Sequence, residues 1–156
     1  DAQARHLFAT GLVDDVIVAN AYASEAELKA LSEINRDLLT FGLKLEEGVS
    51  EVEKEIIFNF KHHVRADMPE YMARSTMSRI AYANADIPVG NVADLKRGDV
   101  VVLNNEYGHY KGELHIILQD MPNNGAKNIV GSIPEYELAM LEYVVPNAKF
   151  AFSEVK

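Results

Sequence analysis

The sequence lacks cysteine, which excludes disulfide bonds and thiolate nucleophiles. It also has no apolar run near the roughly 18 residues that a membrane-spanning helix needs, and no signal-peptide pattern at its start. Basic residues are scarce: 15 Lys and Arg stand against 24 Asp and Glu, a formal net charge of −9. Because such a surface repels polyanions on average, we expect neither nucleic acid nor a membrane as a partner, and we predict a cytoplasmic location.

The 156 residues that are present suffice for one domain with a real core, or for one domain plus a fragment of another. Hydrophobic residues make up 48% of the chain and charged residues 25%, values typical of a globular protein.

The first 34 residues show the pattern of an α/β domain. A helix is predicted over 1–11, ending at Gly11, and a strand over 13–19, in which Asp14 and Asp15 lead into the continuous apolar run 16–18. The capping-box pair Ser24 and Glu27 then predicts the start of a second helix. Because a strand that is apolar on both faces needs cover on both sides, residues 1–34 are interpreted as part of a larger parallel-sheet domain.

After Asn35 the pattern changes to short strands, and we place a domain boundary there. The predicted strands cover 38–45, 74–79, 100–103, 113–118, 127–133 and 149–152. A second capping box, Ser50 and Glu53, predicts a helix over 51–60, and Pro134 predicts a short helix over 135–142. Residues 62–69 are predicted to be loop, and the strands 100–133 an antiparallel meander. Residues 35–156 are therefore predicted to be a mainly β domain with flanking helices.

Two arginines form the first candidate binding group. Arg74, Ser75 and Arg79 place two guanidinium groups and a hydroxyl in one short segment, a combination that grips phosphate or carboxylate through charge-assisted hydrogen bonds. The alternative is that both arginines pair with surface glutamates.

The reversal between the strands 100–103 and 113–118 forms the second group. It carries Asn104, Asn105, Tyr107, Tyr110, Lys111 and Glu113. Strand alternation predicts Lys111 and Glu113 on one face as an ion pair, with Tyr110 opposite. The amides and phenols suit sugar hydroxyls and Lys111 suits a phosphate. The alternative is that the Asn and Gly residues serve turn geometry and that the tyrosines cover the core.

Other polar residues carry weaker signals. The spacing of His62, His63, His109 and His115 matches no metal-ligand pattern, so we predict no metal and no cofactor. The stretch 20–24 follows the predicted strand 13–19 and precedes a helix. In complete (β/α)₈ barrels a loop in this position often binds phosphate. The alternative is that Ser24 serves only as the N-cap of the following helix.

Several segments resemble one bacterial two-domain family. They are GLVDDVIVANAYASEAEL, LKLEEGVSEVEKEI, RSTMSR, NNEYGHYKGELHI, the NIVG run and LAMLEYVVPNAKF. They resemble the MupG-type 6-phospho-N-acetylmuramidases, whose members were once described as outer surface proteins. The resemblance implies that residues 1–34 match the last strand and helix of a (β/α)₈ barrel, and that residues 35–156 form a cyclophilin-like β-barrel domain.

The resemblance also implies a function. The chain is expected to be the C-terminal part of a glycoside hydrolase that acts on 6-phosphorylated N-acetylmuramyl sugars in cell-wall recycling, and to contribute substrate recognition. The catalytic carboxylates are expected on the barrel outside this chain. Arg74, Arg79 and Lys111 are expected to place cations at the mouth of that barrel, either in the same protein or in a neighbouring subunit of a homo-oligomer. The alternative is a non-catalytic ligand-binding or subunit-interaction module.

Overall fold

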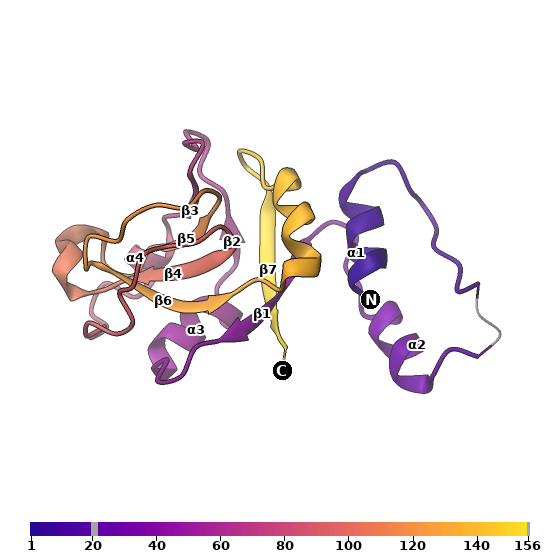
Figure 1. Cartoon of the computed structure of the whole chain (residues 1–156), viewed down its shortest axis with the longest axis horizontal. Coiled ribbons are helices and arrows are strands. Elements are labelled where there is room, and N and C mark those ends of the chain that lie inside the picture. The colour runs from indigo at the N-terminus through magenta and orange to yellow at the C-terminus, as the bar shows by residue number, and fades with distance from the viewer. Residues whose placement is uncertain (20–21, 156) are drawn as a thin grey trace.

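The structure, a computed structural model, describes residues 1–19 and 22–155 (Figure 1). The helices are α1 (Ala2–Ala9), α2 (Glu25–Ser32), α3 (Glu51–Asn59) and α4 (Ser78–Ala81), with 3-10 helices η1 (Asn105–Tyr110) and η2 (Glu135–Tyr143). The strands are β1 (Leu39–Leu45), β2 (His62–His63), β3 (Met72–Ser75), β4 (Asp99–Leu103), β5 (Leu114–Ile117), β6 (Lys127–Ser132) and β7 (Lys149–Glu154). None of the helices within these ranges is long and apolar enough to cross a membrane.

One seven-stranded sheet organises the chain after residue 38. Its order is β2-β7-β1-β6-β4-β5-β3, with β1 and β7 parallel and the other neighbours antiparallel. The sheet curls until its two ends meet, where the backbone N–H of Arg65, just after β2, donates to the carbonyl of Arg74 in β3 at 2.9 Å. The prediction of a mainly β, barrel-like fold with flanking helices is confirmed.

The core fills the inside of this barrel. Alternate residues of the strands point inward, among them Phe41, Val100, Ile116 and Phe150, and Ile56 enters from α3; all are at most 1% exposed. The capping box of Ser50 and Glu53 is present and starts α3 as predicted.

A second, smaller apolar cluster covers the outside of β3, β4, β5 and β6. It contains Met72, Val101, Leu103, Ile117 and Ile129, with Leu95 from the preceding loop. Tyr107 and Tyr110 of η1 pack against it. Arg74 and His115 alternate with the inward-facing residues of β3 and β5, so their polar side chains share this outer face.

The predicted meander is wrong in its order. β6 pairs with β4 and β1 and does not lie beside β5. The connection 118–126 is too long for a tight reversal, and its Met121 forms a bridge with Leu95 on the outer face. The chain therefore passes over β4 before β6 begins.

Two further local predictions are wrong. Residues 62–63 form β2 rather than loop, because His62 is buried and pairs with Phe150 of β7. The segment 74–79 is a strand only as far as Ser75, after which α4 begins.

The N-terminal helices lie beside the barrel, with α1 against η2 and α2 farther out (Figure 1). The predicted strand 13–19 is wrong: among the described residues no strand lies beside it, and Ile17 is 87% exposed. A strand cannot form without a hydrogen-bonding neighbour. Residues 20 and 21 of the predicted loop 20–24 lie outside the described residues, and Ser24 caps α2 through the predicted capping box.

Candidate anion-binding site

A buried carboxylate holds the two predicted arginines together. Glu113, which is 0% exposed, accepts hydrogen bonds from Arg74 Nε at 3.3 Å and Nη2 at 2.9 Å through Oε2. Arg79 Nη1 lies 3.2 Å from the other oxygen, Oε1. The guanidinium carbons of Arg74 and Arg79 lie 5.8 and 5.2 Å from the centroid of the Tyr110 ring. Both arginines therefore pair with the same carboxylate and pack near the same aromatic ring.

Strand register explains why these residues meet. Arg74 of β3 pairs directly with His115 of β5, and Glu113 precedes His115 by two positions, so all three point to the outer face. α4 brings Arg79 to this face because the Ser78 hydroxyl donates to the carbonyl of Gly112 at 2.7 Å.

Gly112 lies directly against α4. Its φ of +83° favours glycine, and even a Cβ at this position would only reach contact distance, 3.4 Å from the Cα of Arg79. The reversal before β5, which the sequence predicts to be a binding segment, thus also positions Arg79.

The electrostatics favour an ionised Glu113 and a neutral His115. Burial opposes ionisation of Glu113, but the hydrogen bonds from His115 and Arg74 outweigh it, so the pKa of this carboxyl group is lowered. Burial lowers the pKa of His115 despite the neighbouring carboxylate. Because Nε2 of His115 lies 3.1 Å from Glu113 Oε2, which only accepts, we assign the proton of the neutral ring to Nε2.

A hollow of about 250 Å³ opens beside this cluster. It is lined by Pro69, Tyr71, Met72, Arg74, Leu103, Tyr107, Tyr110, Glu113 and His115. Tyr107 and Tyr110 stand edge to face, with ring centroids 5.7 Å apart. An anionic group of phosphate size, with part of a sugar ring against the tyrosines, suits this size and lining.

The structure does not bring every predicted residue to the hollow. Arg79 reaches Glu113 and Tyr110 but is not one of the residues that line the hollow. Ser75 points into the core and bonds to Nδ1 of the buried His62. Asn104 is buried and bonds to Gly125 and Asn128. Asn105 bonds to Asp86 and to the backbone of Ile87.

The predicted ion pair of Lys111 and Glu113 is wrong. Lys111 Nζ donates to the carbonyl of Ala85, while Glu113 binds the arginines and His115. Tyr110 also shares the outer face with Glu113, because η1 bends the chain before β5 and simple strand alternation does not apply there.

Sequence reasoning missed two residues of this face, His115 and Lys127. His115 follows Glu113 by two positions, so strand alternation alone places both on one face. Lys127 lies opposite Leu103 in the β4–β6 pair, with its Nζ 5.2 Å from the centroid of the Tyr107 ring. Finding Lys127 requires the strand order, which the sequence did not reveal.

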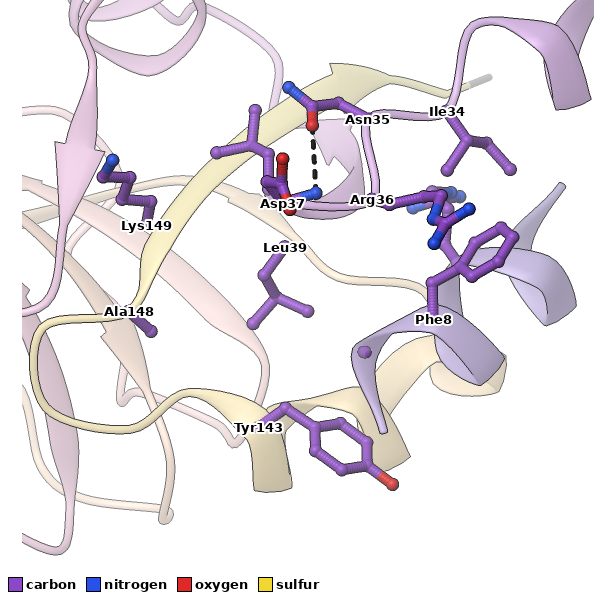
Figure 2. Close-up of a pocket in the computed structure, with 12 residues that line it drawn as sticks. Phe8, Ile34, Asn35, Arg36, Asp37, Leu39, Tyr143, Ala148 and Lys149 are labelled. Carbon is purple, nitrogen blue, oxygen red and sulfur yellow. Dashed lines mark hydrogen bonds between the residues drawn. The ribbon is translucent and has the colours of Figure 1, made fainter. Parts of the chain in front are cut away.

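A second hollow, of about 220 Å³, lies where α1 meets the barrel. Figure 2 shows it bounded by Phe8, Leu39 and Tyr143. Two of its polar side chains bind within the chain: Asn35 Oδ1 accepts from the backbone N–H of Asp37, and the Arg36 guanidinium lies 5.3 Å from the Phe8 ring centroid. We interpret it as the junction of the N-terminal helices with the barrel.

The chain matches two models of one protein family. The model described as 6-phospho-N-acetylmuramidase, C-terminal, matches residues 39–153, and the N-terminal model of that family matches residues 1–33. A comparison with curated proteins found no match.

Two solved structures are similar. A crystal structure of an uncharacterized B. cereus protein has a TM-score of 0.93 and 48% identity, covering 98% of this chain and 44% of that one. A conserved Enterococcus faecalis protein with an unknown function has a TM-score of 0.68 and 24% identity, covering 98% and 40%, and at that identity it supports the fold alone. The chain thus spans less than half the length of both. With the family models matching nearly its whole length, the chain belongs to the 6-phospho-N-acetylmuramidase family.

Proposed function

We propose that this chain recognises the anionic part of a 6-phosphorylated N-acetylmuramyl sugar, as the C-terminal part of a glycoside hydrolase that works in cytoplasmic cell-wall recycling. The family membership supports the class of reaction. The observation that carries the role of this part is the pair Arg74 and Arg79, held on one buried carboxylate beside a hollow with tyrosine walls.

The chemistry of such a substrate matches these groups. A 6-phosphorylated N-acetylmuramyl sugar carries a phosphate and a lactyl carboxylate, and arginine binds both kinds of anion with paired, charge-assisted hydrogen bonds. Each arginine has five N–H donors. Glu113 takes only some of them, so the side chains of Arg74 and Arg79, which are 23% and 29% exposed, keep donors for a ligand.

Recognition suits this hollow better than bond cleavage. Glycoside hydrolysis generally needs two carboxyl groups, one as proton donor and one as base or nucleophile. Of the described residues that line the hollow, Glu113 alone carries a carboxylate, and it is ionised and engaged by three side chains. We place the catalytic carboxylates in the part of the longer relatives that this chain does not span.

Calorimetry with N-acetylmuramic acid 6-phosphate tests the proposal. Arg79→Gln removes one cation while leaving the Arg74–Glu113 bonds, and we expect it to weaken binding roughly 10- to 100-fold, the value of one hydrogen bond to a charged group. Lys61→Gln, at an exposed position, is the matched control and should bind like the unaltered chain. Equal affinity of the Arg79→Gln variant and the control would remove the assignment.

A binding module without turnover is the second candidate, favoured by the single engaged carboxylate at the hollow. In the full-length enzyme the two candidates differ in one result. Arg79→Gln slows hydrolysis of the phosphorylated sugar if the hollow recognises the substrate of the hydrolase. It weakens binding without changing hydrolysis if this module binds its ligand independently of the catalytic part.

A further inference from the structure

The charged side chains beside and behind the hollow are mostly positive. Arg74, Arg79 and Lys127 contribute three cations, and Glu113 contributes one carboxylate. His115 adds no charge while its ring is neutral. The group therefore has an excess of two positive charges in a chain whose formal net charge is −9.

One of these cations, Lys127, is buried: the residue is only 5% exposed. Its Nζ donates to Asn124 Oδ1 at 3.2 Å and lies over the Tyr107 ring. An amide oxygen and a ring face both favour the ammonium form, although burial lowers the pKa of Lys127. Within the part of the chain that the structure describes, no carboxylate lies within ion-pair distance of this ammonium.

Tyr107 connects Lys127 to the hollow. One face of the ring lies against the ammonium, and the residue also lines the hollow together with Leu103, the register partner of Lys127. The lysine is therefore behind the wall of the hollow, where low exposure reduces solvent screening of its field.

Buried charges in proteins are normally balanced by charges of opposite sign. An excess of two positive charges calls for a dianion rather than a monoanion. A phosphate monoester carries about −1.5 to −2 at neutral pH and offers three acceptor oxygens, whereas a carboxylate or a sulfate ester carries a single negative charge.

We propose that the hollow takes the phosphate monoester of the substrate as a dianion, in preference to its carboxylate, and that Lys127 is a further residue that sets this preference. The inference rests on the proposed function, because it names which of the two anionic groups of that substrate occupies the site. Arg74, which lines the hollow, contacts the phosphate, while Arg79 beside Glu113 and Lys127 behind Tyr107 act through their charges.

Three sugars with different groups at C6 test the preference: N-acetylglucosamine 6-phosphate, N-acetylglucosamine 6-sulfate and glucuronate. Their affinities for the chain are measured by calorimetry at one pH above 7 and one low salt concentration. We expect the phosphate to bind at least roughly tenfold tighter than the sulfate or the carboxylate.

The variant Lys127→Met keeps the apolar stem and removes the charge. We expect it to weaken phosphate binding about tenfold and sulfate binding less, so that the ratio of the two affinities falls. Lys61→Met is the control for loss of a positive charge at an exposed site and should leave the ratio unchanged. A ratio unchanged in Lys127→Met would exclude the role of Lys127.

A measurement on the unaltered chain keeps the test decisive if Lys127→Met does not fold. Phosphorus NMR of the bound 6-phosphate should show its second pKa below that of the free sugar, because the cations favour the dianion. An equal or higher value would overturn the inference. Binding of none of the three sugars would instead overturn the proposed function, while equal binding of all three would overturn the phosphate preference alone.

Discussion

The strongest stability prediction concerns a buried ion pair that joins α1 to the barrel. Glu137 of η2 is 1% exposed and accepts hydrogen bonds from Arg5 Nη2 at 2.7 Å, from Arg5 Nη1 at 3.2 Å and from the backbone N–H of Gly42 at 2.7 Å. Arg5 is 8% exposed and also donates to the carbonyl of Thr40. The substitution Glu137→Ala removes one partner and leaves the other charge buried.

The expected loss follows from that geometry. Breaking a buried ion pair by removing one member costs about 3–5 kcal/mol, because the remaining charge loses its buried partner. Arg5 Nε still lies 3.2 Å from Asp1 Oδ2, which offsets part of the loss, whereas the Gly42 N–H loses its acceptor, so the expected loss stays within this range. For a chain of this size the melting temperature should fall by roughly 10 °C. In the double variant Arg5→Met/Glu137→Met the charges disappear together, so its loss should be smaller than that of Glu137→Ala.

Urea unfolding followed by circular dichroism measures these free energies. The control is Glu33→Ala, which breaks the pair with Lys29 on α2, where the side chains are 75% and 65% exposed and 3.9 Å apart. That change should cost less than about 0.5 kcal/mol. A loss below about 1 kcal/mol for Glu137→Ala would refute the reasoning, because it would mean that Arg5 is hydrated once its partner is gone.

Two further predictions concern the barrel and its helices. Burial lowers the pKa of His62 to about 4, so below pH 6.5 the unfolded chain binds a proton at this residue that the folded chain does not bind. The free energy of unfolding should therefore fall by about 3 kcal/mol between pH 7 and pH 4. In urea titrations His62→Gln should reduce this pH dependence, whereas His63→Gln should not. Ser50→Ala should lower the global free energy of unfolding by about 1 kcal/mol, because α3 packs on the core, whereas Ser24→Ala should only increase amide exchange within α2, which has no buried residue; equal global effects of the two changes would contradict this.

The elements that depend on neighbours along the chain were predictable. Both capping boxes form as Ser24–Glu27 and Ser50–Glu53 predict, and the apolar runs around Val100 and Ile116 become strands. Their signals are local: a side-chain cap acts over three residues, and an inward-facing row follows from strand alternation.

The strand order was not predictable in the same way. Whether β6 lies beside β5 or beyond β4 depends on where the connection 118–126 packs, and that is decided by contacts such as the bridge from Met121 to Leu95. The apolar run of Val16, Ile17 and Val18 shows the same limit, since its composition suits a strand but strand formation needs a partner.

The candidate site divides along the same line. Arg74, Arg79 and Glu113 were singled out from residue type and local density, and the structure brings them together. Their mutual pairing follows from the β3–β5 register, and the place of Lys127 follows from the β4–β6 register. Lys111 was assigned from its position beside Tyr110, but the bend at Gly108, where φ is +58°, sends its ammonium to Ala85.

The closure of the barrel has a consequence for ligand recognition. The carbonyl that receives the Arg65 N–H belongs to Arg74, so the residue whose guanidinium lies at the hollow also joins the first and last strands of the sheet. Separation of β2 from β3 would leave Arg74 held in the sheet by β5 alone, without its bond to Arg65. A ligand that steadies Arg74 should favour the closed barrel, so a bound anion should slow hydrogen exchange at the Arg65 amide.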